Sequence, residues 1–427
     1  MLVYCDKPSV RLKHVLDFIF NEFYDTNYTL ISNIPEIESN DQFFINYSHE
    51  NHSNCLSISP EGLLSEDFLR TQKEYFTDEQ VLFEQKSLFG FDLFSAVFYL
   101  ISRYEEYLAF TPDKIGRFSS KESMLFEDNM KLVPIIDIWL LNFESLLKEK
   151  NPSFDPSKRK FNVKATIDVD KVYAYKEAGV FRSLGASMRD FIANPPNLNH
   201  RISVLTGTKP DPFFVFDKIE KIHKKHKLKA TYFIHFGEKK LPYDDISGQN
   251  SNALNYWLSQ NKDKSFGLHP SFKSNTETEI IKEEKSLLEK AIGKKVNHSR
   301  QHYLKLSFPQ TYNELIEAGI TNDHSLGFAD SPGFRAGTTH SFKFFNLETN
   351  ESTELTVHPF SLMDTTLRAY QKLNPEEALF FSKSLIDSIK KVDGTFCCLF
   401  HNESLSNWGP WKGWQNLYED VLDYCYS

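Results

Sequence analysis

Apolar and polar positions in the first part of the chain alternate in short stretches that predict a small α/β unit. Leu2–Cys5 is an apolar run typical of a strand, and apolar residues three and four positions apart predict a helix over Val10–Tyr24. Short β-prone runs follow, and we expect further strands near Tyr28–Ile31, Phe43–Tyr47 and Cys55–Ile58.

Two longer helices and a polar stretch come next. The 3.6-residue period predicts amphipathic helices from about Phe91 to Phe110 and over Val133–Leu147. The stretch Lys148–Lys160 (KEKNPSFDPSKRK) is charged, contains prolines and has little apolar content, which is typical of a linker. We therefore expect an N-terminal α/β accessory domain at residues 1–155 and a second domain at residues 156–427.

Beyond this linker, strand and helix patterns alternate. Ser274 with Glu277 is a capping-box signature for a helix that ends at Gly293, and Asn374-Pro375 begins a later helix. This alternation is typical of parallel βα units and of barrels closed by them. The predicted strands are Phe161–Asp170, Lys229–His235, Phe266–Leu268, Val296–Ser299 and Thr395–Phe400.

The composition is that of a globular, acidic protein. At 427 residues the chain is too long for one ordinary domain, and its hydrophobic content of 40% indicates a large packed core. A net charge of −9 argues against nucleic acid as the main partner, because phosphate binding requires concentrated lysine and arginine. The N-terminus lacks the features of a signal peptide, and the apolar stretch Phe91–Ser102 is shorter than the roughly 20 residues that span a bilayer. We expect a cytoplasmic protein without a membrane span.

Four of the predicted strands end in polar side chains. Asp168 and Asp170 are two residues apart, so both leave the same face of their strand. In α/β barrels and open parallel sheets the reactive face lies at the carboxyl ends of the strands, so polar residues at four such ends predict one shared site. The residues concerned are Asp168 and Asp170, then His269, then Arg300 and His302, and finally His401.

These side chains suit hydrolysis that is assisted by a divalent metal. Neutral imidazoles and ionised carboxylates are good ligands, and a bound cation polarises a carbonyl and lowers the pKa of water from 15.7 to roughly 7. One carboxylate must stay off the metal to accept a proton, and a separate acid must protonate the leaving group. The shared strand face of Asp168 and Asp170 places a metal ligand beside a general base.

Several segments resemble motifs of the NodB-like polysaccharide deacetylases, which are the family 4 carbohydrate esterases. The segments are TIDVD, KATYFIH, GLHPS, SRQHYL and LFHNE, in this order. The resemblance covers about residues 161–427 and implies a distorted (β/α) barrel that removes N- or O-acetyl groups from glycans with a divalent metal. The first part of the chain resembles the poorly characterised domain that precedes this barrel in a bacterial subgroup of the family.

The resemblance also implies a role for each polar residue. Asp168 matches the catalytic base, and Asp170 matches the metal-binding carboxylate. His269 matches the first metal histidine. Arg300 matches the arginine that orients the base by an ion pair, a role that suits its bidentate guanidinium. His401 matches the histidine that acts as general acid.

One position departs from the family pattern. The usual second metal histidine lies four residues after the first, where this chain has Lys273, and a protonated lysine is a poor metal ligand. His302 lies two residues after Arg300, where the family commonly has proline, and therefore on the same side of an extended chain. We predict that Asp170, His269 and His302 hold the cation, and we expect zinc.

Other polar and aromatic residues have less specific interpretations. Arg335 is expected either to pair with an acidic sugar or a site carboxylate, or to form a surface ion pair. Asp364 is a candidate for the pocket, whereas a loop-turn role is preferred for Ser271 over ligation. A cluster of tryptophans forms either a wall for a sugar ring or a packed cap, the preferred interpretation: Trp408, Trp411 and Trp414.

We therefore predict a metal-dependent deacetylase-like hydrolase that acts on an acetylated sugar or glycan precursor. Its expected fold is α/β, with a distorted (β/α) barrel of the NodB-like type after a smaller N-terminal domain. Two alternatives keep the barrel: a catalytically inactive glycan-binding or assembly protein, and a metal-dependent C–N hydrolase of a non-sugar amide. The expected partner is a carbohydrate and not nucleic acid, and the sequence leaves the oligomeric state open.

Overall fold

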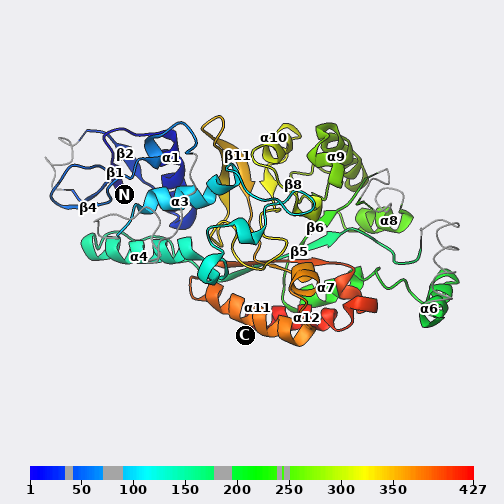
Figure 1. Cartoon of the computed structure of the whole chain (residues 1–427). Coiled ribbons are helices and arrows are strands. Elements are labelled where there is room, and N and C mark those ends of the chain that lie inside the picture. Colours follow the sequence, from blue (N-terminus) through cyan, green and yellow to red (C-terminus); the bar gives the residue numbers. More distant parts are fainter. Residues whose placement is uncertain (34–41, 71–89, 177–194, 238–242, 245–250) are drawn as a thin grey trace.

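The computed structural model describes residues 1–33, 42–70, 90–176, 195–237, 243–244 and 251–427. Figure 1 shows an elongated molecule in which a small sheet lies at one end, near the N-terminus, and a larger sheet lies in the middle. Both sheets are built mainly from parallel strands, so the fold is mixed α/β. Within the described ranges, no helix combines the length and the apolar character needed to cross a membrane.

The small sheet contains parallel strands in the order β2-β1-β3-β4. They lie within the stretches where apolar runs predict them. Helix α1 begins after Ser9, whose hydroxyl accepts a hydrogen bond from the backbone of Leu12, and it continues as a π-helix. The elements are β1 (Leu2–Tyr4), α1 (Val10–Leu16), the π-helix (Asp17–Phe23), β2 (Thr29–Ile31), β3 (Phe44–Asn46) and β4 (Cys55–Ser57).

Helix α3 is shorter than the sequence pattern predicts. It ends at Ile101 rather than near Phe110, and all of its residues are buried, so it is not amphipathic. Arg103 adopts a left-handed backbone with φ of 55°, and its buried guanidinium pairs with Glu105 and Glu106. Neither glycine nor proline ends the helix, so the usual sequence signal for a boundary is missing. The helices of this part are α3 (Leu93–Ile101) and α4 (Ile135–Lys150).

The larger sheet has the strand order β10-β11-β9-β8-β7-β6-β5-β13-β12. Its pairs are parallel except for β10 and β11, which form an antiparallel hairpin. The strands are β5 (Asn162–Val169), β6 (Thr231–Ile234), β7 (Ser265–Leu268), β8 (His298–Ser299), β9 (Asn322–Asp323), β10 (Phe342–Asn346), β11 (Glu351–Val357), β12 (Leu362–Met363) and β13 (Thr395–His401).

The described strands do not pair into a closed barrel. β10 and β12 stand at the two ends of the strand order. Near β12, Phe360 N–H donates to the carbonyl of Leu326 at 3.0 Å, whereas Ser361 N–H donates to the carbonyl of Cys397 at 3.0 Å and so continues the pairing of β12 with β13. The segment before β12 therefore contacts both the chain after β9 and strand β13, so the sheet is strongly curled.

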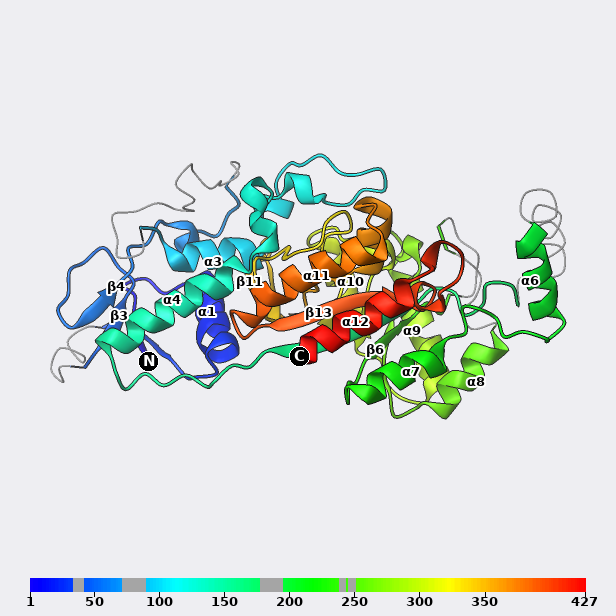
Figure 2. The same cartoon turned by 90° about the horizontal axis from the view of Figure 1, so that it is seen from below.

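Helices cover the outside of this curled sheet. In Figure 1, α9 and α10 lie above the strands, and α7, α11 and α12 lie below them. Figure 2 shows α11 and α12 running along β13, and α11 contacts both of them. The helices are α6 (Pro195–Leu205), α7 (Phe216–Lys225), α8 (Asn252–Gln260), α9 (Thr278–Ile292), α10 (Gln310–Glu317), α11 (Pro375–Lys390) and α12 (Trp414–Tyr426).

The two predicted helix starts behave differently. The Asn374 side chain accepts hydrogen bonds from the first turn of α11, and the Glu377 side chain accepts one from the Asn374 backbone, which completes a capping box. The expected box of Ser274 with Glu277 does not form, because Glu277 precedes α9 without a side-chain cap. Ser274 is instead buried in a 3₁₀ turn, where its hydroxyl lies 3.4 Å from the Gln301 side chain.

The two sheets share one hydrophobic core. A single cluster of buried side chains includes Val3 of β1, Leu16 of α1 and Ile167 of β5. Helix α1 contacts β11, and Arg335 forms a buried ion pair with Glu106. The N-terminal part therefore packs against the larger sheet through apolar and charged contacts.

Candidate metal and catalytic site

Four neighbouring strands of the larger sheet, β5 to β8, end at the same level. Val169 of β5, Ile234 of β6, Leu268 of β7 and Ser299 of β8 are paired in succession. The next residue of β5, β7 and β8 is respectively Asp170, His269 and Arg300, so polar side chains from three strands start at one level. On the other side of β5, Asp168 is paired with His401 of β13.

All but one of the predicted site residues line a single cavity of about 290 Å³. Arg300, the exception, lies behind Asp168 and is fully buried. The predicted residues at the cavity surface are Asp168, Asp170, His269, His302 and His401.

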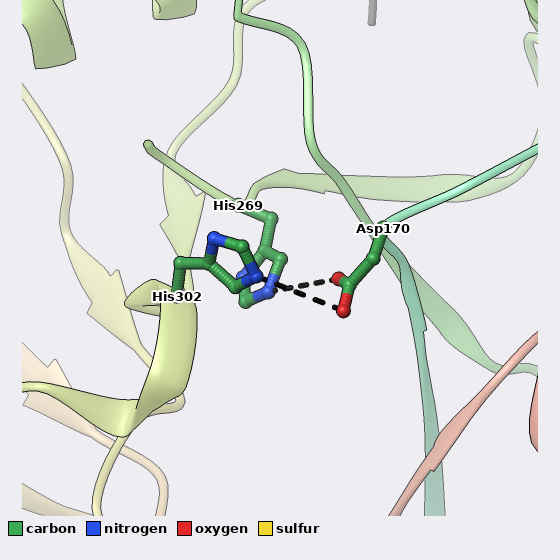
Figure 3. A group of neighbouring side chains, drawn as sticks. All are labelled: Asp170, His269 and His302. Carbon is green, nitrogen blue, oxygen red and sulfur yellow. Dashed lines mark ion pairs between the residues drawn. The ribbon is translucent and has the colours of Figure 1, made fainter. Parts of the chain in front are cut away.

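Asp170, His269 and His302 form a group of potential metal ligands. Figure 3 shows both imidazoles facing the carboxylate from one side. His269 Nε2 lies 3.2 Å from Asp170 Oδ1, and His302 Nε2 lies 3.7 Å from Asp170 Oδ2. One donor atom from each of the three side chains lies within 4.8 Å of the others, so one cation is able to contact all three.

Each imidazole is oriented by a hydrogen bond at its other nitrogen. His269 Nδ1 donates to the carbonyl of Arg300 at 2.6 Å, and His302 Nδ1 donates to Asp244 Oδ1 at 2.6 Å. Because these partners only accept, the Nε2 atoms keep their lone pairs when the rings are neutral, as metal-ligating histidines do. Burial raises the pKa of Asp170, but the neighbouring His269 and His302 outweigh burial when they carry a proton on Nε2, and they hold the pKa of Asp170 well below its usual value.

A second group of side chains adjoins the first and shares His302. His235 and Asp244 lie close to the Nδ1 side of His302, and all three are buried. His235 Nδ1 contacts the carbonyl of His269 at 3.1 Å, and burial lowers the pKa of His235 to about 4. His235 therefore contacts the backbone of His269, and Asp244 holds the ring of His302, both on the side away from Asp170.

Asp168 and Arg300 form a buried ion pair. Arg300 Nη1 donates to Asp168 Oδ1 at 2.8 Å and to Thr166 Oγ1 at 2.7 Å, and Nε donates to the carbonyl of His324 at 2.9 Å. The guanidinium also lies over the ring of Phe233, 4.5 Å from its centroid. These contacts fix one oxygen of Asp168 and leave Oδ2 on the side of His269, 3.8 Å from Nε2.

His401 is paired with Asp364. The Nδ1 atom donates to Asp364 Oδ1 at 2.7 Å, and the His401 backbone N–H donates to Oδ2 at 2.7 Å. Burial lowers the pKa of His401, but the carboxylates of Asp364, Asp170 and Asp168 outweigh it and raise the pKa to about 10. The Nε2 atom lies 3.9 Å from Asp170 Oδ2, inside the cavity.

Several cavity residues were given no role from the sequence. Three of them, Gln301, Tyr303 and Leu304, belong to the SRQHYL motif, and the others lie outside every quoted motif: Arg117, Met363, Thr365 and Tyr370. Glu403, in the LFHNE motif, also lines the cavity, and burial raises its pKa to about 7. Trp411 is the one cavity residue among the predicted tryptophans, whereas Trp408 stacks on His200.

Some predicted positions lie away from the cavity surface. Lys273 is 41% exposed and lies 3.6 Å from Glu277, so it does not occupy a ligand position. The Ser271 hydroxyl donates to Glu284. The expectation of a surface ion pair for Arg335 is wrong, because Arg335 is buried against Glu106.

Comparisons with known proteins give one family match and several distant structural neighbours. Residues 1–152 match the model of a family of unknown function, DUF7033. No curated protein matches the chain. A Mycobacterium smegmatis protein assigned as a polysaccharide deacetylase is similar over 63% of this chain and 86% of its own, with 15% identity and a TM-score of 0.41.

Two further structures belong to the family that the sequence motifs resemble. The family 4 carbohydrate esterase domain of a xylanase from the hindgut metagenome of Trinervitermes trinervoides is similar over 62% of this chain and 82% of its own, with 11% identity and a TM-score of 0.30. A family 4 pseudoenzyme from Bacillus anthracis is similar over 63% of this chain and 62% of its own, with 11% identity and a TM-score of 0.29. At such distances, activity must be argued from the site of this chain.

Proposed function

We propose that this protein is a metal-dependent hydrolase that removes an acetyl group from a sugar or glycan precursor. The observation that carries the proposal is the arrangement of Asp170, His269 and His302, whose donor atoms lie within 4.8 Å of one another. The buried pairs of Asp168 with Arg300 and of His401 with Asp364 flank this group. The proposal includes a distorted, incompletely closed barrel at residues 156–427 and an accessory domain at residues 1–155.

The donor set fits a divalent cation, and zinc suits it best. Two imidazole nitrogens and one carboxylate oxygen are typical of catalytic zinc sites, which keep a further position for water or substrate. Asp170, His269 and His302 would hold the cation, and the hydrogen bonds at both Nδ1 atoms orient the rings for it. When bound, the cation supplies Lewis-acid polarisation of the acyl carbonyl and a lowered pKa for water.

Asp168 acts as the general base in this proposal. Arg300 holds Oδ1, so Oδ2 is free to accept a proton from the attacking water near the ligand group. The ion pair also holds the carboxylate in one orientation. Asp168 is therefore assigned to proton transfer and Asp170 to ligation, although both come from one face of β5.

His401 acts as the general acid. Asp364 accepts the hydrogen bond from Nδ1, so the Nε2 proton of the imidazolium points into the cavity, where it is available to the leaving group. The raised pKa of His401, about 10, keeps the imidazolium protonated at neutral pH. The residues that orient the acid and the base thus differ, and each catalytic group has its own partner.

The cavity surface suits a sugar. Tyr303, Tyr370 and Trp411 provide aromatic faces beside the polar residues, and aromatic rings are able to pack against the apolar face of a pyranose. The volume of about 290 Å³ is close to the lower end of small-molecule sites, about 300 Å³, and so fits one sugar unit.

Metal analysis and acetate release test the proposal together. The purified wild-type protein should bind one equivalent of Zn²⁺ by calorimetry and elemental analysis, and His302→Ala should lose it. Lys273→Ala is the matched control and should bind as the wild type does, because Lys273 lies outside the ligand group. Unchanged metal stoichiometry in His302→Ala would refute the ligand assignment.

The catalytic roles are tested on a panel of acetylated amino sugars. Asp168→Asn and His401→Ala should keep the metal and lose acetate release, because neither side chain is a proposed ligand. Acetate release by Asp168→Asn at the wild-type rate contradicts the assigned base. A wild-type protein that binds acetylated sugars without metal or turnover would instead be a glycan-binding protein on this fold.

A further inference from the structure

Arg117 reaches the cavity from a different part of the chain. It lies within residues 1–152, which match the family of unknown function, and between α3 and α4. It nevertheless lines the same cavity as Asp170 and His302, which belong to the larger sheet and its loops. The N-terminal part of the chain thus contributes a side chain to the proposed active site.

The guanidinium of Arg117 holds three different partners. Nη1 donates to the carbonyl of Tyr303 at 2.8 Å, and Nη2 donates to the hydroxyl of Tyr370 at 2.8 Å. Nε donates to Asp113 Oδ2 at 2.8 Å. Tyr303 and Tyr370 both line the cavity and are far apart in the sequence. Arg117 therefore connects two walls of the cavity that strand pairing does not connect.

This use of the guanidinium argues against a role as an anion receptor. The Asp113 carboxylate lies 2.8 Å from Nη2 as well as from Nε, so the positive charge is already paired. The remaining nitrogen, Nη1, is directed at the carbonyl of Tyr303. Arg117 is also largely buried, with 7% of its surface exposed. This geometry is that of a structural side chain, which holds the segments of Tyr303 and Tyr370 together.

The segment around Arg117 is itself fixed at both ends. Asp113 Oδ1 accepts from the backbone N–H groups of Ile115 and Arg117, at 3.0 and 2.9 Å. After Arg117, the Ser119 hydroxyl donates at 2.6 Å to Asp330, which belongs to the second part of the chain. The loop that carries Arg117 to the cavity is therefore held by hydrogen bonds within the loop and by a hydrogen bond to the second part of the chain.

The contact with Tyr303 matters because of the backbone there. Tyr303 and Leu304 both have left-handed φ values, 60° and 56°, and neither is a glycine or an asparagine. Residues with side chains keep this conformation only where surrounding contacts determine it. His302, the third proposed ligand, comes directly before this turn, so the turn places its backbone, while the hydrogen bond to Asp244 orients its ring.

We propose that Arg117 is a positioning residue that holds the turn at Tyr303 and thereby keeps the His302 imidazole in its place beside Asp170. This inference rests on the proposed function, because it concerns the same ligand group. It gives the N-terminal part of the chain a defined role, which is to complete the metal site of the larger sheet through a single arginine.

Zn²⁺ affinity tests this role directly, measured on the full chain by competition with a chromophoric chelator. Arg117→Gln removes the positive charge of the guanidinium and most of its hydrogen-bond donors. It should weaken Zn²⁺ binding by about tenfold, which is the lower end of the loss seen when a residue that supports a metal ligand is replaced. Arg11→Gln is the matched control. Arg11 is another buried arginine of the N-terminal part and bonds to Asn350 Oδ1 at 2.8 Å, away from the cavity. The control should keep wild-type affinity.

A glycine background separates positioning from a general structural effect. Glycine adopts positive φ readily, so Tyr303→Gly removes the need for an external contact at that residue. In this background, Arg117→Gln should weaken Zn²⁺ binding much less than it does in the wild type. Equal losses in both backgrounds would overturn the positioning role. The Co²⁺ absorption spectrum gives a second readout, because displacement of His302 changes the ligand field in Arg117→Gln but not in Arg11→Gln.

The outcomes distinguish this inference from the proposed function. If the wild type binds no Zn²⁺, the proposed function fails, and this inference fails with it. If the wild type and Arg117→Gln bind Zn²⁺ equally, the metal site stands and the role of Arg117 is refuted. Should Arg117→Gln not fold, Arg117→Lys is measured instead. A lysine ammonium cannot reproduce the planar fork, so a folded Arg117→Lys with wild-type affinity also overturns the inference.

Discussion

The buried pair of Asp168 and Arg300 allows a quantitative prediction. Arg300 is fully buried, Asp168 is 2% exposed, and the Nη1 and Oδ1 atoms are 2.8 Å apart. We consider Arg300→Met, which preserves much of the side-chain length and removes the charge and every donor. The Asp168 carboxylate then stays buried without its ionic partner, and Thr166 loses one hydrogen bond.

The magnitude follows from the distance and the burial. At 2.8 Å and an effective dielectric constant of about 20, the attraction between two unit charges is about 6 kcal/mol, and the cost of burying both charges offsets much of it. Removal of one partner from a buried pair costs about 3–5 kcal/mol, because the remaining charge is unpaired. We expect Arg300→Met to lower the free energy of unfolding by this amount. Asp168→Asn should also destabilise, because it leaves Arg300 unpaired.

The assay is urea denaturation at pH 7 of the wild type, both single variants and the double variant Arg300→Met/Asp168→Asn. The double variant has no unpaired charge, so its loss should be at least about 2 kcal/mol smaller than the sum of the single losses. Arg368→Met, which removes a cation over the ring of Trp411, is the control and should show no coupling with Asp168→Asn. Single losses that add within about 0.5 kcal/mol would refute the reasoning, because independent sites add in this way.

Three further predictions concern the surroundings of the site. Burial raises the pKa of Glu284, which binds Ser271, from 4.5 to about 7, so its ionisation opposes folding: about 3 kcal/mol of stability should disappear as the pH rises from about 4.5 to about 7. Urea denaturation at pH 5 and pH 8 should show a smaller loss in Glu284→Gln, and an equal loss contradicts this account. Asp364→Asn removes the carboxylate that contributes most to raising the pKa of His401, so the alkaline limb of the pH profile of kcat should move to lower pH. If this limb does not move, His401 is not the general acid whose pKa the limb reports. Trp411→Ala should raise KM at least about tenfold with a smaller change in kcat if the ring binds sugar, and an unchanged KM assigns Trp411 to packing alone.

The strand-end part of the site was predictable because strand geometry is regular. The two-residue period places Asp168 and Asp170 on one face, and parallel pairing brings residues after β5, β7 and β8 to one level. His401 follows from the same rule, since it is paired with Asp168 across β13 and β5. To predict that these residues lie close together, it was enough to recognise the strands and their parallel direction.

The side chains that orient the site were not predictable in this way. Asp244, Asp364 and Arg117 lie outside the predicted strands, and each meets its partner through the path of a loop. No period relates a loop residue to a strand end 58 residues away, which is the separation of Asp244 from His302. Asp364 was recognised as a pocket candidate, but not as the partner of His401. The end of α3 was missed for a related reason, because Arg103 ends it through contacts and not through a local sequence signal.

In the proposed metal site, the second imidazole comes from His302 in the loop after β8, and not from the position of Lys273 in the loop after β7. A cation selects donor atoms by their position in space, and adjacent parallel strands are only about 4.8 Å apart, so the loops after β7 and β8 both reach the same point. Here the chain after β7 turns into a 3₁₀ turn that leaves Lys273 exposed, whereas the chain after β8 brings His302 Nε2 to 3.7 Å from Asp170. A left-handed turn follows this histidine directly, at Tyr303. A ligand moved to this loop therefore needs a contact that holds the turn, and Arg117 provides one from the other part of the chain.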